Sequence, residues 1–116
     1  MSFTELGLIE PLIRSTTEQG YLEPTPIQKQ AIPAILSGKD VFASAQTGTG
    51  KTASFVLPIL QRLVNKPRAG NNAVKILILT PKRELAGQVH DSIREYGRHM
   101  SVRSTVGLGV LKLILR

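Results

Sequence analysis

The chain has 116 residues, 41% of them hydrophobic and 20% charged, which allows one small globular domain and excludes a second. It has no cysteine, which excludes disulfides and thiolate metal sites, and its first residues lack the basic and apolar regions of a signal peptide. Since no apolar run is long enough to span a bilayer, we expect a soluble, cytoplasmic protein with no membrane partner.

The net charge of +7 is unevenly distributed along the chain. Residues 1–61 contain four Lys or Arg and five Asp or Glu, a net of −1, whereas residues 62–116 contain eleven and three, a net of +8. This basic half indicates either a polyanionic partner such as a nucleic acid or simply a solvated basic surface.

Helical segments are expected before residue 40. Residues 9–19 predict a helix that ends at Gly20, a residue suited to the C-terminal cap. Thr25 and Pro26 suit the N-cap and the first helical position of the next segment, which Pro33 should divide into two short helices.

A strand and a longer helix are expected next. Residues 40–45, DVFASA, predict a short strand. From Lys51 onward apolar residues recur at helical spacing, with Pro58 as an expected kink, and Pro, Gly and Asn then predict a loop over residues 65–73. The recurring residues are Phe55, Val56, Ile59, Leu60 and Leu63.

The second half alternates strand and helix. Residues 73–80, AVKILILT, form a nearly continuous apolar run, which is typical of a strand buried on both faces of a parallel sheet. Residues 83–98 predict a helix and residues 101–106 another strand. The apolar stripe of that helix comprises Leu85, Val89, Ile93 and Tyr96. This order predicts an α/β fold in which helices flank a parallel sheet and the crossovers are right-handed.

The sequence AQTGTGKT, at residues 45–52, predicts a phosphate-binding loop. Small residues let successive backbone N–H groups converge on an anion, and the following helix turns its positive end toward the same point. Ala45 stands where the strict pattern has glycine, so the alternative is a glycine-rich turn that only caps a core helix.

The expected chemistry of this loop involves ATP and Mg²⁺. Lys51 would reach the β and γ phosphates, and the Thr52 hydroxyl would ligate Mg²⁺. Gly48 and Gly50 would let the backbone approach the phosphates.

Three ordered segments together resemble the DEAD-box RNA helicases. GYLEPTPIQ, at residues 20–28, looks like the Q motif of that family, AQTGTGKT is similar to its motif I, and TPKRELAGQ, at residues 80–88, resembles its motif Ia. The wording is closest to the bacterial RhlE-like subgroup. The resemblance implies an ATP-dependent RNA helicase with a RecA-like fold.

The same resemblance implies a domain assignment. Residues 1–116 would be the N-terminal portion of the first RecA-like helicase domain, with the Q motif at about 3–28, the P-loop at 45–52 and motif Ia at 80–88. Residues 106–116 would be an atypical tail.

Carried over to this sequence, the Q motif implies an adenine site. Gln28 would read the adenine edge and Tyr21 would stack on the ring, because a side-chain amide can both donate to and accept from adenine. Phe3 would pack near the base, and Thr25 would help hold this segment against the phosphate loop. The alternatives are plain core packing for the two aromatic residues and an exposed helix position for Gln28.

The resemblance also implies a phosphate site and contacts with the RNA backbone. The nucleotide-binding positions of the loop are Ala45, Gln46, Thr47, Gly48, Thr49, Gly50, Lys51 and Thr52, of which the last two would be catalytic. The RNA-binding positions are Pro81, Lys82 and Arg83 in motif Ia, together with Gly107 and Gly109. Lys82 replaces the usual threonine and would meet a phosphate as a point charge. Leu108 splits a glycine pair that the family usually keeps together.

Three further polar residues receive structural interpretations. Glu84 should complement the dipole of the helix that it begins. His90 and His99 have no sequence neighbours that suggest catalysis or a metal, and we interpret both as surface residues.

The sequence lacks the D-E-A-D and S-A-T motifs of the family. The remaining acids after residue 61 are Glu84, Asp91 and Glu95, and none follows a buried strand. Because phosphoryl transfer to water needs a carboxylate for Mg²⁺ and positive charge beyond the γ phosphate, this chain alone should bind nucleotide and RNA without hydrolysis or unwinding. The alternatives are a non-catalytic basic nucleic-acid-binding module and a fragment that pairs with a helicase.

The last residues, VGLGVLKLILR, depart from the family wording. One hypothesis is a one-base change of reading frame near Val106, and the other is a divergent tail that forms a short strand or helix. A sheet of about three strands would leave apolar edges exposed, so we expect marginal folding or association through those edges.

Overall fold

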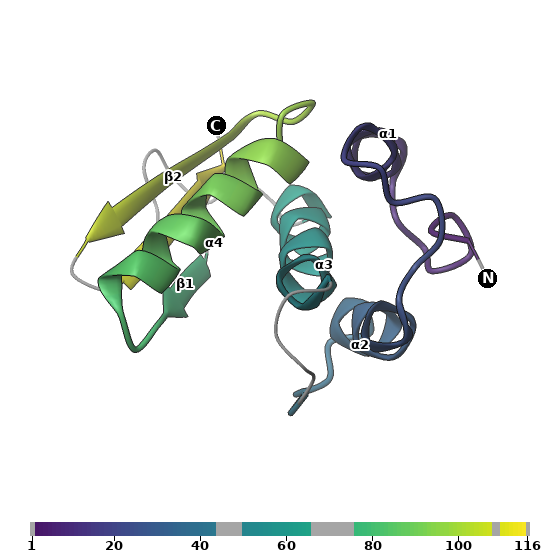
Figure 1. Cartoon of the computed structure of the whole chain (residues 1–116), viewed down its shortest axis with the longest axis horizontal. Coiled ribbons are helices and arrows are strands. Elements are labelled where there is room, and N and C mark those ends of the chain that lie inside the picture. Colours follow the sequence, from purple (N-terminus) through teal and green to yellow (C-terminus); the bar gives the residue numbers. More distant parts are fainter. Residues whose placement is uncertain (1, 44–49, 66–75, 108–109, 116) are drawn as a thin grey trace.

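The computed structural model describes residues 2–43, 50–65, 76–107 and 110–115, and its elements are labelled in Figure 1. Four helices and three strands follow one another in the described residues. They are α1 (Glu10–Glu18), α2 (Pro26–Leu36), α3 (Lys51–Asn65), β1 (Ile76–Leu79), α4 (Arg83–Tyr96), β2 (Val102–Gly107) and β3 (Val110–Leu115). Of these helices, none is long and apolar enough to cross a membrane.

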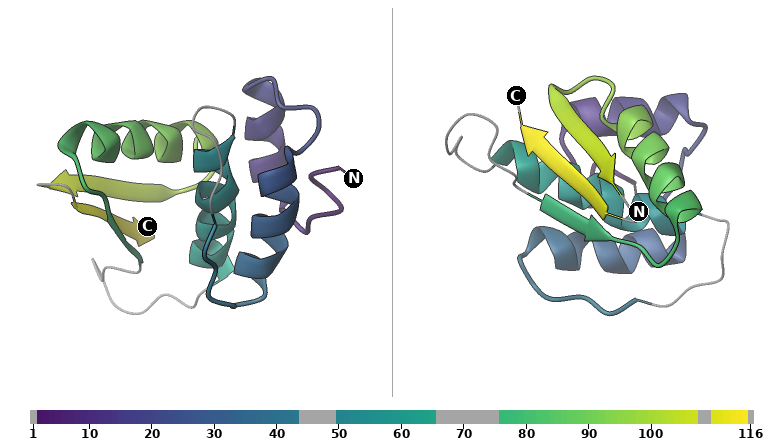
Figure 2. Two further views of the ribbon diagram at one scale, coloured as in Figure 1. Left: turned by 60° about the horizontal axis from the view of Figure 1, so that its bottom comes forward. Right: turned by 90° about the vertical axis from the view of Figure 1, so that its left-hand side faces the viewer.

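Helix α3 stands at the centre of the molecule. The sheet and α4 lie on one side of it, and α1 and α2 lie on the other (Figures 1 and 2). Its buried face contains Val56, Leu57, Leu60 and Leu63, all inaccessible to solvent. The predicted apolar spacing of α3 is therefore confirmed, because the residues of this stripe form the core between the sheet and α4 on one side and α1 and α2 on the other.

The first two helices begin and end largely where the sequence predicts. Helix α1 ends at Glu18, and Gly20 follows in the left-handed region at φ +89°, as the capping prediction requires. Helix α2 begins at Pro26 with Thr25 as its N-cap. The expected break at Pro33 is wrong, because α2 continues to Leu36. Pro33 is exposed on this helix, so its ring faces solvent and the missing N–H removes one hydrogen bond without breaking the helix.

Helix α4 is confirmed, but its buried stripe is shifted. Val89, Ile93 and Tyr96 are buried as expected, whereas Leu85 is 38% exposed and Ala86 is fully buried in its place. Glu84 lies in the first turn, as predicted for the helix dipole.

The described sheet is antiparallel and has the order β1-β3-β2, which corrects the parallel sheet expected from the sequence. Strand β3 pairs antiparallel with β1, from Ile76↔Leu113 to Leu79↔Val110, and with β2, from Val102↔Leu115 to Gly107↔Val110. Strands β1 and β2 run in the same direction, as a β-α-β unit requires, but the tail lies between them as β3. The tail forms strand β3, which agrees with the interpretation of a tail that folds as a short strand. The structure does not test the other hypothesis, a change of reading frame near Val106.

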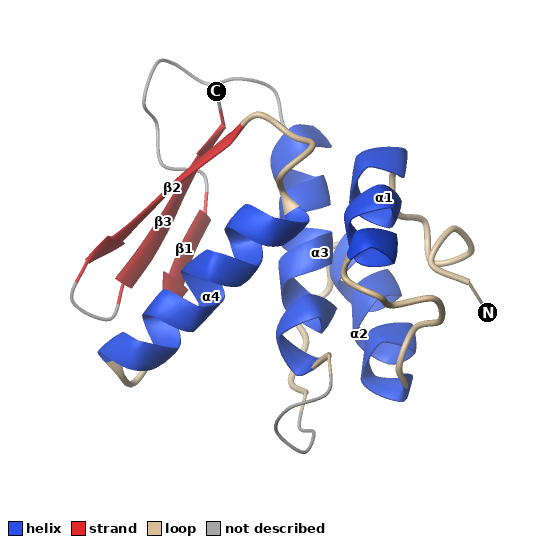
Figure 3. Ribbon diagram, turned by 45° about the horizontal axis from the view of Figure 1, so that its top comes forward, coloured by secondary structure: helices blue, strands red, loops and turns tan. Residues whose placement is uncertain are grey.

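One face of the sheet is covered by α4, as Figure 3 shows. Along β1, Ile76 and Ile78 are partly buried against the core, whereas Leu77 is 56% and Leu79 70% exposed. The expectation that this strand is buried on both faces is wrong, since an antiparallel sheet with one covered face buries alternate side chains only.

The strand expected at residues 40–45 does not form where the chain is described. Residues 40–43 have no regular structure and pair with none of the described strands, and Phe42 is 99% exposed. A strand is stable only with a hydrogen-bonded neighbour, so the apolar pattern alone could not make one here. Residues 44 and 45, and residues 66–73 of the expected loop, lie outside the described residues.

Candidate nucleotide-binding site

Gln28 forms a capping box with Thr25 at the start of α2. Its backbone N–H donates to Thr25 Oγ1 at 3.4 Å, and its Oε1 accepts from the Thr25 N–H at 2.9 Å. The reciprocal pair satisfies two of the N–H groups that a helix N-terminus leaves without partners. Gln28 is also fully buried, which excludes the alternative of an exposed helix position.

The same side chain reaches the residue that precedes α3. Gln28 Nε2 donates to the carbonyl oxygen of Gly50 at 3.2 Å. Gly50 has φ +75°, and a Cβ there would collide with Gln28 Nε2 and lie 3.2 Å from Thr25 Cγ2. The Q-motif segment and the end of the phosphate loop therefore meet at a contact that only glycine permits. In this structure the hydrogen bond to the end of the loop comes from Gln28. Thr25 only lies close to Gly50 with its Cγ2 atom, so its role in holding the loop stays a prediction.

Lys51 and Thr52 form the first turn of α3 and are half-buried. Their position places an amine and a hydroxyl beside the positive end of a 15-residue helix, the usual setting for a bound phosphate. A cavity of about 410 Å³ opens next to them, between α2, α3 and the residues that follow α2, and Lys51, Asp40 and Phe55 contribute to its lining.

The two aromatic residues of the expected base site contribute to the core. Phe3 is 4% exposed within the main apolar cluster, and Tyr21 is partly buried against that cluster. The Tyr21 hydroxyl also lies beside Tyr96. The pKa of Tyr96 is raised, mainly because the side chain is buried and to a smaller extent because of the neighbouring Tyr21 hydroxyl. Core packing therefore describes Phe3 in this structure, and its contact with a base stays a prediction.

Comparison with known proteins decides the family. The family model for DEAD/DEAH box helicases matches residues 25–112, which is most of the chain and includes the Gln28 and Gly50 contact. This chain belongs to that family. Two curated relatives are DEAD-box ATP-dependent RNA helicase RhpA of Helicobacter pylori and ATP-dependent RNA helicase SrmB of Escherichia coli. The chain is 47% identical to RhpA over 108 residues, 93% of the chain, and 51% identical to SrmB over 98 residues, 84% of the chain.

Solved DEAD-box structures share the fold. The chain resembles the RNA helicase Prp28 from Chaetomium thermophilum bound to ADP, with a TM-score of 0.76 and 37% identity over 91% of the chain. It also resembles a DEAD box protein from Methanococcus jannaschii, with a TM-score of 0.72 and 39% identity over 83% of the chain. The predicted α/β, RecA-like fold class is confirmed.

The chain spans only a small part of these DEAD-box proteins. It covers 21% of RhpA, 22% of SrmB and 26% of the Prp28 chain. The predicted likeness to DEAD-box helicases is thus confirmed, whereas membership of the RhlE-like subgroup stays a prediction.

Three of the five expected RNA-binding positions, Pro81, Lys82 and Arg83, lie at the start of α4. Pro81 and Lys82 are exposed, and Lys82 is the N-cap residue, with no hydrogen bond from its side chain to the helix. Gly107 ends β2. The Arg83 side chain and Gly109 lie outside the described residues, as do the loop positions Ala45, Gln46, Thr47, Gly48 and Thr49.

Both histidines keep some exposure, which agrees with their interpretation as surface residues, but each has a polar partner that the sequence did not indicate. His99 Nε2 lies 2.6 Å from Glu18 Oε1, and His90 Nδ1 lies 3.0 Å from Ser104 Oγ. Both histidines are half-buried. Their partners are 81 and 14 residues away in sequence, so only the folded chain brings these groups together.

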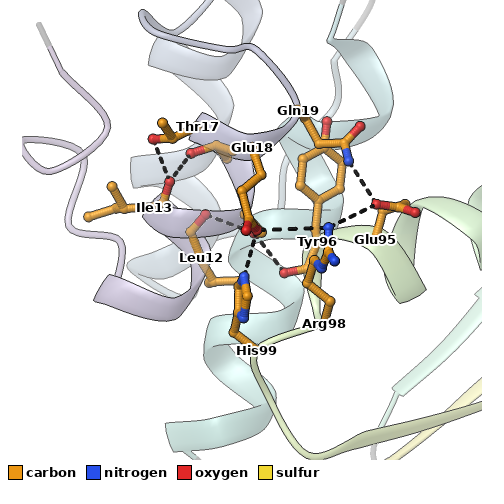
Figure 4. A network of polar contacts seen from close by, with 11 residues as sticks. Leu12, Ile13, Thr17, Glu18, Gln19, Glu95, Tyr96, Arg98 and His99 are labelled. Carbon is orange, nitrogen blue, oxygen red and sulfur yellow. Dashed lines mark hydrogen bonds and ion pairs between the residues drawn. The ribbon is translucent and has the colours of Figure 1, made fainter.

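Sequence reasoning also missed the polar contacts that hold α1 in place. The buried Ser15 Oγ donates to the Tyr96 carbonyl oxygen at 2.8 Å. Gln19 Nε2 donates to Glu95 Oε2 at 2.7 Å, as Figure 4 shows. A buried Gln61 on α3 binds the segment before α1. A polar residue on the apolar stripe of a helix, as Ser15 and Gln61 are, is the sequence signal that could have indicated them.

Proposed function

We propose that this chain binds adenine nucleotides as the opening part of the first RecA-like domain of an ATP-dependent RNA helicase. The hydrogen bond from Gln28 to Gly50 is the observation that carries the proposal, because it joins the adenine-reading residue of the family to the end of the phosphate loop. The names of the relatives, both ATP-dependent RNA helicases, support the same function.

Each end of the nucleotide would have its own residues. Lys51 would neutralise the β and γ phosphates at the N-terminus of α3, with the loop residues before it supplying backbone N–H groups. Tyr21 would stack on the base, and Phe3 would support it from the core.

Gln28 can serve adenine while it keeps its present partners. Its amide has one oxygen with two lone pairs and one nitrogen with two hydrogens, and the bonds to Thr25 and Gly50 use one of each. One donor and one acceptor remain, which is the pair that the adenine edge requires. Because Gln28 is fully buried, its side chain must become accessible before adenine can reach the remaining donor and acceptor.

A magnesium ion fits the site only with help from the nucleotide. The Thr52 hydroxyl would be one oxygen ligand, and no group of three or more His, Asp or Glu that could hold a metal occurs among the residues described. Mg²⁺ accepts phosphate oxygens and water for its other positions, so Thr52 would hold the ion together with a bound triphosphate. The ion would neutralise charge on the phosphates.

Hydrolysis and unwinding are not proposed for the 116 residues alone. The D-E-A-D carboxylates and the S-A-T motif are not in the sequence, so these 116 residues lack the family's carboxylate ligand of Mg²⁺ and the motif that couples hydrolysis to unwinding. The proposed activity is nucleotide binding, with the cytoplasm, where both ATP and RNA occur, as the predicted location.

An equilibrium titration with ATP and GTP tests the proposal. We expect tighter binding of ATP, and a loss of at least about tenfold in ATP affinity for Lys51→Ala, since a charge-assisted contact to phosphate contributes more than a neutral one. Lys29→Ala, which removes an exposed charge from α2, is the matched control and should bind ATP normally. Equal retention of ATP and GTP, or an unchanged affinity for Lys51→Ala, would contradict adenine-nucleotide binding at this loop.

Contact with the RNA backbone is a second proposed function. It is favoured by the exposed Pro81 and Lys82 at the N-terminus of α4, where the Lys82 side chain makes no capping hydrogen bond and is available to meet a phosphate. The competing function, a basic module that ignores its loop, predicts RNA binding that is indifferent to ATP. Measuring RNA affinity with and without ATP distinguishes the two.

A further inference from the structure

Gln61 of α3 binds the N-terminal segment through both the oxygen and the nitrogen of its side-chain amide. Its Oε1 accepts a hydrogen bond from the Ile9 N–H at 2.8 Å, and its Nε2 donates one to the Gly7 carbonyl oxygen at 2.7 Å. Gln61 is only 7% exposed, so water competes weakly for either partner. These two bonds cross more than 50 residues of sequence and fix the segment before α1 on the phosphate-binding helix.

The segment held by Gln61 folds back on the core. The Leu6 N–H donates to the Phe3 carbonyl oxygen at 3.2 Å, and Gly7 turns the chain in the left-handed region at φ +93°. Phe3, Leu6 and Leu8 are each about 95% buried. A loss of the Gln61 bonds would therefore weaken the docking of a short segment that carries Phe3, and undocking would also expose the side chains of Phe3, Leu6 and Leu8.

A continuous set of contacts leads from Gln61 to the expected base site. Ile9, which Gln61 binds, is the N-cap of α1, and at the other end of α1 the Tyr21 N–H donates to the Thr16 carbonyl oxygen at 3.0 Å. Tyr21 and Phe3 are the two residues proposed for the base. Gln61 also lies about 15 Å along α3 from Lys51, so one rigid helix joins the phosphate end to the residue that holds the base end.

We propose that Gln61 is a positioning residue for adenine binding: it docks residues 3–9 on α3 and thereby sets the base-dependent part of the nucleotide affinity without touching the nucleotide. This inference rests on the proposed function. If undocking leaves about a tenth of the molecules in the docked state, the apparent ATP affinity falls about tenfold. Inorganic triphosphate, which meets only the loop and the start of α3, binds docked and undocked chains alike.

The test compares Gln61→Met, which keeps the volume and removes both hydrogen bonds, with a control on the neighbouring residue. Arg62 Nη1 donates to the Ile35 carbonyl oxygen at 3.2 Å, a contact with α2 and not with the N-terminal segment, so Arg62→Met is the control. For Gln61→Met we expect about a tenfold loss of ATP affinity, an unchanged affinity for inorganic triphosphate and faster amide hydrogen exchange at residues 3–9. Arg62→Met should leave all three quantities as in the wild type.

A pH-dependent rescue separates positioning from a general loss of structure. In Gln61→Glu, a protonated carboxyl group can accept from Ile9 and donate to Gly7, as the amide does, whereas the carboxylate has no proton to donate. The ATP affinity of this variant, relative to the wild type at the same pH, should be near wild type at about pH 5, because burial raises a glutamate pKa, and about tenfold weaker at about pH 8.

Each outcome decides between the two proposals. Equal losses for ATP and inorganic triphosphate, a loss of the same size in Arg62→Met, or wild-type ATP affinity in Gln61→Met overturns the role of Gln61 and leaves the proposed function intact. A wild-type chain that binds no ATP overturns the proposed function and the coupling with it; unchanged hydrogen exchange at residues 3–9 in Gln61→Met overturns the docking step itself.

Discussion

The His99 ring and the Glu18 carboxylate lie 2.6 Å apart and join the turn after α4 to the end of α1 (Figure 4). Arg98 adds positive charge, with its Nη1 3.9 Å from Glu18 Oε1 and 4.0 Å from Glu95 Oε2. The hydrogen bond from His99 is the main reason why the pKa of Glu18 lies below its ordinary value of 4.5; burial opposes it, and the charges of His99, Arg98 and Arg14 each add a smaller lowering effect.

This lowered pKa predicts acid sensitivity. Folded Glu18 stays charged at a pH where the unfolded chain has begun to take up the proton, so its contribution is complete above the ordinary pKa of 4.5 and is lost as the pH falls through the folded value. Glu18→Gln should therefore flatten the acid end of the curve of unfolding free energy against pH. Urea denaturation at several pH values measures it, with the exposed Glu23→Gln as the control; curves of equal slope for Glu18→Gln and wild type would exclude the effect.

Substitution by alanine should have opposite effects at two glycines, Gly50, which contacts Gln28, and Gly87, which has open space around it. Gly50→Ala should cost about 1–3 kcal/mol of unfolding free energy and weaken ATP binding, because of the positive φ and the collision with Gln28. Gly87→Ala, inside α4 with open space around the added methyl group, should stabilise the chain by about 0.5–1 kcal/mol. Thermal and urea unfolding of both variants provide the measurement, and a harmless Gly50→Ala would show that the contact is not tight.

The capping box predicts a graded response at Thr25. Thr25→Ala removes the oxygen that accepts from the Gln28 N–H and should lower the unfolding free energy by about 1 kcal/mol. Thr25→Ser retains that oxygen and should stay close to wild type. If the two variants unfold at the same denaturant concentration, the cap is not what stabilises the start of α2.

The open face of the sheet predicts self-association. The side chains of Leu77 and Leu79 are exposed on β1, an edge strand without proline or charge. Leu79→Lys should shift the chain toward the monomer in sedimentation velocity runs at increasing concentration. Val64→Lys, on α3 and 41% exposed, is the control and should leave the distribution unchanged. A wild-type chain that is monomeric at all concentrations would contradict the prediction.

The exposed lysine at the start of α4 predicts a change in salt dependence. If Lys82 meets one phosphate, Lys82→Ala should lower the slope of log affinity for RNA against log salt by about 1 and weaken binding to all sequences alike. Lys39→Ala, an exposed charge outside α4, serves as the control. An unchanged slope for Lys82→Ala would place the RNA contact elsewhere.

The sequence by itself determined the features that depend on residues within a few positions of one another. Thr25 and Pro26 start α2, Gly20 follows the end of α1, and the amphipathic spacing after Lys51 forms α3, because capping, left-handed turns and helical stripes are local. Three short sequence motifs, GYLEPTPIQ, AQTGTGKT and TPKRELAGQ, are local in the same sense, and they identified the family correctly.

Only the tertiary structure decided which strands pair and which polar groups meet. The nearly continuous apolar run predicts that β1 is a strand, but not that β3 would take the place beside it, nor that residues 40–43 would find no partner in the described sheet. Likewise, the hydrogen bond between Gln61 and Ile9 and the contact of His99 with Glu18 join residues that are 52 and 81 positions apart. Such pairings depend on the relative placement of whole elements, which is set by the packing of α3 between its neighbours. A polar residue on an apolar stripe, such as Gln61, can therefore indicate a buried partner in the local sequence, but not which residue that partner is.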